Sequence, residues 1–138
     1  MQVNDQEIRK VQSRVKAREE RNRLVTLGSR VVQRVRDLVL EPYVAEGFFT
    51  DERPRSVVLL RAQLCLGLYQ CGFSLPMCAL AVMQRRSHTT ALGSVRRAGA
   101  MLDEDGLPAG FNERARTVGE LRVLIVRECE KEGLKAMR

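Results

Sequence analysis

The chain has 138 residues, of which 44% are hydrophobic and 30% charged, and it carries a net charge of +7. These values are typical of one globular domain, and no apolar run approaches the ~18 residues that a membrane helix needs. The first residues, MQVNDQEIRK, are polar where a signal peptide would be apolar. We therefore expect a cytoplasmic protein without a membrane partner.

The positive charge is concentrated in the middle of the chain. Residues 1–52 carry ten basic and nine acidic side chains, and residues 103–138 carry seven and eight. Residues 53–102 contain no Lys, Asp or Glu, and their arginines are Arg53, Arg55, Arg61, Arg85, Arg86, Arg96 and Arg97. A region of one sign attracts a polyanion, and the forked guanidinium suits phosphates and guanine edges. Nucleic acid is the partner that this pattern favours.

The first predicted element is a charged helix over residues 4–27. Its apolar side chains on one side are Ile8, Val11 and Val15. A solvated helix, a dimerisation coil and an arm that tracks DNA are all compatible with this pattern. We expect Gly28-Ser29 to end the helix and Ser29 to cap a second one, which has a stronger apolar stripe. This divides the chain into a helical arm, 1–28, and a domain, 29–138.

The following segments predict an all-α bundle of five to six helices, because Gly and Pro fall between stretches of helical periodicity. Pro42 interrupts or restarts the second helix, and a loop leads to Ser56, which should cap a helix that Gly72 ends. Ser74 is expected to cap a short helix over 75–84. The expected core residues of the next segments are Met77, Leu80, Val82 and Leu92.

The last part of the chain contains two more predicted helices. Ser87 should cap the first, HTTALGSVRRAGAML, which the loop DEDGLPAG follows. The final packing helix covers about 112–134 and opens at Asn112 or Thr117. Thr117 and Glu120 have the spacing of a capping box.

A short helix, a tight turn and a capped helix over residues 74–102 form the pattern of a helix-turn-helix motif. In this motif the first residues of the second helix enter the DNA major groove. Threonine methyl groups can pack on the C5-methyl of thymine, and hydroxyl groups or an imidazole can bond base edges. The residues at this position are Ser87, His88, Thr89 and Thr90.

Three stretches resemble one known family. SLP at 74–76 and RRSHTTALGSVRRA at 85–98 are similar to the C-terminal DNA-binding domain (domain IV) of the bacterial chromosomal replication initiator DnaA. RPRSVVLLRAQ at 53–63 resembles the basic loop of that family and the helix after it. The resemblance covers about 30–102. It implies a DnaA C-terminal or Trp-repressor-like bundle that binds double-stranded DNA at DnaA-box-like sites.

The resemblance also implies a role for individual residues. Arg53 matches an arginine that enters the minor groove. The implied base contacts are Arg53, Ser87, His88, Thr89 and Thr90. The implied or expected backbone contacts are Arg55, Arg61, Leu75, Pro76, Arg85, Arg86 and Arg97. Ser87 stands where the family has an aspartate, which would accept a hydrogen bond from cytosine N4, so we expect altered discrimination at that base pair.

Other departures from the family concern the turns and the enzyme module. The turn before Ser87 is one residue longer and the preceding loop, CGF, is one residue shorter, which would re-aim the recognition helix. No G-x-x-x-x-G-K-[ST] motif occurs in these residues, so the ATPase of the initiator is not part of them. The resemblance therefore implies a regulator or accessory of replication initiation or of transcription. It would act in the bacterial nucleoid, or be phage-encoded and act in the host cytoplasm.

The same residues allow other interpretations. A catalytic or metal-binding role of His88 is not supported. The sequence contains no second histidine, and residues 53–102 contain no carboxylate that could orient the imidazole. We therefore expect no catalytic residue, metal, cofactor or small-molecule substrate, and four reduced, buried cysteines. The possible protein partners are the replication initiator and a second copy of the chain, through the arm. The alternative functions are binding of an acidic protein and transcription regulation without a link to replication.

Overall fold

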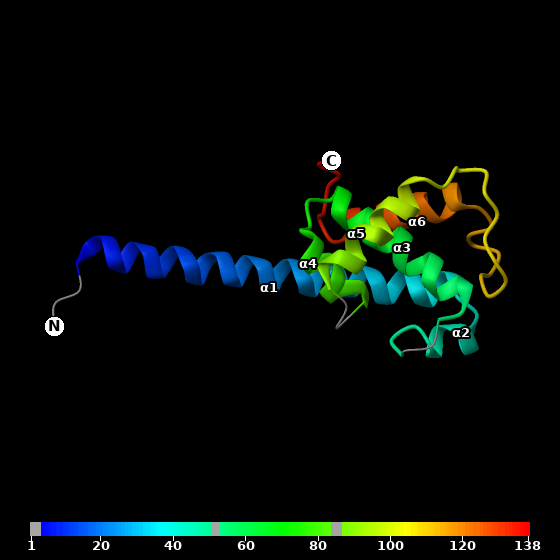
Figure 1. The fold of residues 1–138 in the computed structure, drawn as a ribbon, viewed down its shortest axis with the longest axis horizontal. Coiled ribbons are helices and arrows are strands. Elements are labelled where there is room, and N and C mark those ends of the chain that lie inside the picture. Colours follow the sequence, from blue (N-terminus) through cyan, green and yellow to red (C-terminus); the bar gives the residue numbers. More distant parts are fainter. Residues whose placement is uncertain (1–3, 51–52, 84–86) are drawn as a thin grey trace.

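The computed structural model describes residues 4–50, 53–83 and 87–138, and these residues form a helical bundle (Figure 1). Its elements are α1 (Asp5–Val39), α2 (Pro42–Glu46), α3 (Arg55–Gln70), α4 (Leu75–Cys78), a π-helical turn (Ala79–Met83), α5 (His88–Gly99) and α6 (Val118–Lys131). The described residues contain isolated β-bridges but no strand, which confirms the predicted all-α class. None of their helices combines the length and the apolar character that crossing a membrane requires.

Helix α1 runs without interruption for 35 residues, so the predicted helix end at Gly28-Ser29 is wrong. Gly28 is buried, and a β-carbon there would lie 2.7 Å from Cε2 of Phe73. A glycine inside a helix costs only about 1 kcal/mol, so close packing against an aromatic ring readily outweighs this local signal. Gly28 marks a close approach of two segments, and Ser29 caps no helix.

The N-terminal half of α1 projects away from the remaining helices (Figure 1). Its side chains are exposed from Asn4 to Arg23, and Leu24, Val25 and Leu27 are the first that pack against the core. The Oδ1 of Asn4 caps the helix by accepting a hydrogen bond from the Glu7 amide at 2.8 Å. We call the exposed part, residues 5–23, the arm, and the rest of the described chain the body.

The core of the body lies between the C-terminal half of α1 and helices α3 to α6. Its largest fully buried side chains include Phe48, Phe73, Leu60, Leu64 and Leu68. Helix α3 packs against α5 and α6, while α4 and the π-helical turn lie against α1 and α5. All four cysteines are free thiols; Cys65, Cys78 and Cys129 are buried, and Cys71 is half-buried.

Several predicted helix starts require correction. Helix α3 begins at Arg55 after Pro54, and Ser56 is a buried residue of its first turn instead of its cap. Helix α6 begins at Val118, so Asn112 does not open it. The Asn112 side chain instead donates to the carbonyl oxygen of Leu38 at 2.7 Å and fastens the long loop to the end of α1.

Two predicted features at Thr117 and Gly72 are confirmed. Thr117 is the N-cap of α6, and its Oγ1 accepts from the Glu120 amide at 3.2 Å. The Glu120 carboxylate accepts from the amide of Arg116 at 2.8 Å, so the reciprocal bond reaches one residue further back than in a standard capping box. Gly72 follows α3 with a φ of 96°, a conformation that favours glycine.

Candidate nucleic-acid interface

Helix α5 starts at His88, as predicted, and its first turn faces solvent. The Oγ of Ser87 accepts from the Thr90 amide at 3.4 Å and lies 3.3 Å from the Thr90 Oγ1. Ser87, His88, Thr89 and Thr90 are all exposed. A capped helix start with small or medium-sized exposed side chains leaves the last free amide groups accessible to an anion or a base edge.

The segment that precedes α5 in the chain packs against this helix. Ser74 caps α4 by accepting from the Met77 amide at 3.4 Å, and Pro76 occupies the first turn, where no amide is required. The chain continues as a π-helical turn and packs against α5. Leu75 is half-buried and Pro76 is exposed. Arg85 and Arg86, predicted as backbone contacts, lie outside the described residues.

A groove between the start of α3 and α5 brings four predicted site residues together. Arg53, Arg61, Thr90 and Arg97 line it, with Val58, Met83, Gly93 and Ser94. Arg53 comes from the segment before α3, whereas Thr90 and Arg97 belong to α5. Residues 90, 93 and 97 have the i, i+3, i+7 spacing of one helix face, which explains why Gly93 joins them.

A second groove continues from the first toward the long loop. It shares Arg53, Val58 and Arg97 and adds Arg55, Leu59 and Ala62 from α3. Its other wall consists of Met101, Gly106, Leu107 and Pro108. The two grooves therefore form one concave strip along the N-terminal part of α3, and we call this strip, with the exposed start of α5, the basic face.

Arg61 does not fit its predicted role as a phosphate contact. Its side chain is buried, and its guanidinium donates to the carbonyl oxygens of Phe48 and Thr50 while lying 5.2 Å from the centre of the Phe48 ring. This arginine holds the segment after α2 against α3. Arg61 lines the groove, but its hydrogen bonds to the backbone give it a structural role.

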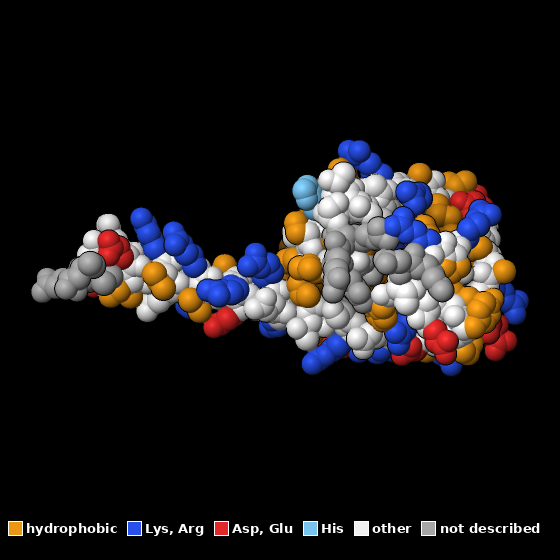
Figure 2. Space-filling view, turned by 60° about the horizontal axis from the view of Figure 1, so that its bottom comes forward, with side chains coloured by type: hydrophobic (Ala, Val, Ile, Leu, Met, Phe, Trp, Pro, Cys, Tyr) orange, Lys and Arg blue, Asp and Glu red, His pale blue; other side chains and the backbone are white. Residues whose placement is uncertain are grey.

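The other arginines of the basic face are exposed. Arg53, Arg55 and Arg97 form no ion pair with another described residue, and neither does Arg96, an exposed neighbour of Arg97 that lines neither groove. The ion pairs within the described part of the chain all involve α1, α6 or the loop before α6. In the view of Figure 2, several Lys and Arg side chains lie across the upper and middle part of the body, while the acidic side chains of the body lie mostly toward the end away from the arm. Guanidinium groups that have no ion-pair partner among the described residues, placed around a concave strip, favour a local positive potential.

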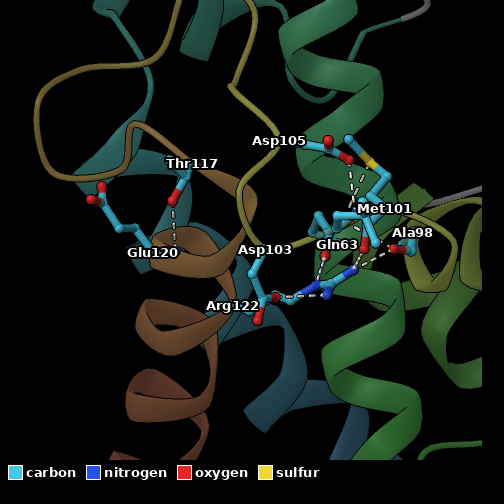
Figure 3. A network of polar contacts seen from close by, with 9 residues as sticks. Gln63, Ala98, Met101, Asp103, Asp105, Thr117, Glu120 and Arg122 are labelled. Atoms are coloured by element: carbon cyan, nitrogen blue, oxygen red, sulfur yellow. Dashed lines mark hydrogen bonds and ion pairs between the residues drawn. The ribbon is translucent and has the colours of Figure 1, made fainter.

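A hydrogen-bond network fixes the C-terminal end of α5 (Figure 3). The Arg122 guanidinium donates to the carbonyl oxygens of Ala98 and Met101 at 2.6 and 2.8 Å, and to the Gln63 Oε1 at 3.1 Å. It also pairs with the Asp103 carboxylate at 3.0 Å. A cation at the end of a helix is favourable for its dipole. Arg122 therefore anchors α5 to α3 and α6 and leaves the other end free to project.

A further ion-pair network joins α1 to α6. The Glu128 carboxylate, only 3% exposed, accepts from the Arg34 Nε and the Lys131 Nζ, both at 2.8 Å. Burial alone would raise the pKa of Glu128, but the hydrogen bonds and charges of Lys131 and Arg34 outweigh it, so the pKa lies below its ordinary value. This network fixes the helix that carries the arm against the body.

Comparison with family models, curated proteins and solved structures gives no match for this chain.

The structure adds residues to the candidate site that the sequence analysis did not select. Gly93 and Ser94 lie on the groove side of α5, and the spacing from Thr90 could have indicated Gly93. Leu107 and Pro108 form a wall of the basic face from a segment more than fifty residues after Arg53, and no local signal links them. His88 and Thr89 lie at the exposed helix start but line neither groove.

Proposed function

We propose that this protein binds double-stranded DNA with sequence preference, using the start of α5 in the major groove and Arg53 in the minor groove. The observation that carries the proposal is the groove that Arg53, Thr90 and Arg97 line together. The sequence resemblance gives these three residues separate roles on one duplex. Their convergence on one concave, uncompensated basic face supports a single bound polyanion.

Within this proposal, His88, Thr89 and Thr90 contact base edges, and Arg55 and Arg97 contact phosphates. Ser87 caps the helix and shares its hydroxyl group with Thr90, so this group has little capacity left for a base. An aspartate at this position, as in the DnaA family, has a second carboxylate oxygen for a base amino group. The preferred site therefore resembles a DnaA box with relaxed discrimination at one base pair.

A DNA-binding domain of this kind acts by occupying its site on DNA. We propose that it regulates or assists replication initiation, or regulates transcription, in the bacterial nucleoid or, if phage-encoded, in the host cytoplasm. An acidic protein is the competing partner class for four exposed arginines. The salt dependence of binding distinguishes an acidic protein from duplex DNA, because each phosphate contact releases counterions and makes the affinity depend more steeply on salt.

Fluorescence anisotropy of a labelled duplex at increasing salt concentration tests the proposal. Four phosphate contacts, by Arg55, Arg97 and the predicted Arg85 and Arg86, give a log–log slope of affinity against salt of about −3.6, at about −0.9 per contact. Arg97→Ala should reduce the slope by about one contact on every duplex. Arg127→Ala is the matched control, because Arg127 is an exposed arginine of α6 outside the basic face. Absence of duplex binding at low salt, or equal effects of the two variants, would contradict the proposal.

The base-reading residues need a separate comparison. His88→Ala or Thr89→Ala should cost about 1–3 kcal/mol on the preferred duplex and much less on a random duplex. If these variants lose the same affinity on both duplexes as Arg97→Ala does, the start of α5 contacts only the backbone.

A further inference from the structure

The arm carries an apolar stripe that the body does not cover. Ile8, Val11 and Val15 are 43%, 57% and 39% exposed, and none of them belongs to the core. Their spacing of three and four residues places them on one side of α1, as in the seam of a coiled coil. Ser13 lies on the opposite side of the helix. The arm is thus a helix with a narrow apolar seam and no partner within the described body.

We propose that a second copy of this chain packs its arm along this seam, in a parallel two-helix pair. The inference does not rest on DNA binding, since it uses only the exposed arm. In a parallel pair Ile8, Val11 and Val15 each meet their own counterpart, which gives three apolar layers. In an antiparallel pair that keeps the same seam, one of these three side chains lies opposite Asn4 or Arg18 instead of an apolar residue.

The charges beside the seam fit the same arrangement. With Ile8 and Val15 at the first heptad position, Arg14 and Glu19 occupy the two flanking positions that meet across a parallel pair. Arg14 of each copy then faces Glu19 of the other. In the single chain neither side chain forms an ion pair with a described residue. Two reciprocal ion pairs therefore become available only on pairing.

The length and the end of the seam indicate a weak association. The stripe is followed by Arg18 and Asn22 at the next seam positions, so the apolar contact is confined to the first part of the arm. An Asn at such a position is compatible with a parallel dimer, because two asparagines can bond across the seam. Both bodies lie at the same end of such a pair. If the protein binds DNA, the dimer presents two basic faces.

Sedimentation equilibrium of the full chain without DNA, from about 10 µM to about 1 mM, covers the range expected for a small interface. The wild type should show a monomer–dimer equilibrium. Val11→Glu should raise the dimer Kd at least ~10-fold, because a carboxylate in the seam loses its hydration. Ser13→Glu adds the same charge on the opposite side and should change the Kd less than ~2-fold. Far-UV circular dichroism verifies that both variants keep their helices.

A charge exchange tests the orientation. Arg14→Glu and Glu19→Arg should each weaken the dimer ~2- to 5-fold, and the double variant should recover most of the loss. A wild type that stays monomeric at 1 mM, or a trimer, overturns the proposal. Equal effects of Val11→Glu and Ser13→Glu overturn the seam, and a double variant without recovery overturns the parallel pairing. Each of these results leaves the duplex-binding experiment unaffected.

Discussion

Arg122→Met removes the guanidinium that anchors α5 while keeping most of the side-chain stem. Four hydrogen bonds are lost, but they contribute unequally to the free energy of unfolding. Ala98 keeps a donor for its carbonyl oxygen, since the Gln63 Nε2 and the Met101 amide also donate to it. The Asp103 carboxyl is 76% exposed, so its pair with Arg122 contributes less than about 1 kcal/mol. The main loss falls on the Gln63 Oε1 and the Met101 carbonyl.

The expected cost follows from these two acceptors. A buried acceptor left without a donor costs about 1–3 kcal/mol, and Arg122 itself is 28% exposed, so water reaches part of the site. We expect Arg122→Met to destabilise the body by about 2–3 kcal/mol. This corresponds to a fall in Tm of roughly 6–15 °C for a domain of this size. Urea unfolding followed by circular dichroism measures the free energy directly.

Two further variants test which contacts of Arg122 account for the loss of stability. Asp103→Asn removes only the exposed ion pair and should cost less than about 1 kcal/mol. Adding Gln63→Leu to Arg122→Met removes one orphaned acceptor and should recover about 1 kcal/mol, because paired removal of polar partners is less costly than removal of one. If Arg122→Met costs no more than Asp103→Asn, the network does not hold α5 in place.

Substitutions at four other positions have clear expected outcomes, measured by thermal unfolding and, for Ser87→Asp, by the preferred DNA sequence. Gly28→Ala should destabilise by about 1–2 kcal/mol, since its β-carbon would lie 2.7 Å from the Phe73 ring; Gly93→Ala, with nothing within 4 Å, should stabilise by up to about 1 kcal/mol. Glu128→Gln should cost about 1–3 kcal/mol at pH 7. Because the Glu128 pKa is lowered in the folded state, this difference should be complete above pH 4.5 and shrink as the pH falls below it. Ser87→Ala should cost about 1 kcal/mol, whereas Ser87→Asp should keep the cap and change the preferred base pair. Equal Tm values for the two glycine variants, a pH-independent Glu128→Gln difference, or an unchanged base preference for Ser87→Asp would each contradict the corresponding argument.

Local chemistry was predictable from the sequence. Ser74, Ser87 and Thr117 were identified as helix caps because a cap depends on a side chain and an amide only three residues apart. Gly72 was identified as a helix end for the same reason, since its positive φ is a local requirement. These signals place the start of α5, and with it the predicted base-reading residues.

Features that depend on distant contacts were not predictable. Gly28 resembles a helix break until Phe73, far along the chain, is seen to pack against it. Leu80 has the spacing of a core residue but is 55% exposed, because it lies in the π-helical turn, where the helical period changes. Arg61 was predicted as a phosphate contact, but its guanidinium is buried and donates to the carbonyl oxygen of Thr50. No local signal indicates that the Arg122 guanidinium donates to the carbonyl oxygen of Ala98 at the end of α5.

Selection of bound sequences from a pool of random duplexes is the most direct test of sequence-specific DNA binding by α5. The account predicts enrichment of one short box related to the DnaA box. Thr89→Ala should clearly weaken the enrichment, while Arg127→Ala should leave it unchanged. Recovery of unrelated sequences, with equal retention of all duplexes by the wild type and Thr89→Ala, would contradict sequence-specific binding by α5.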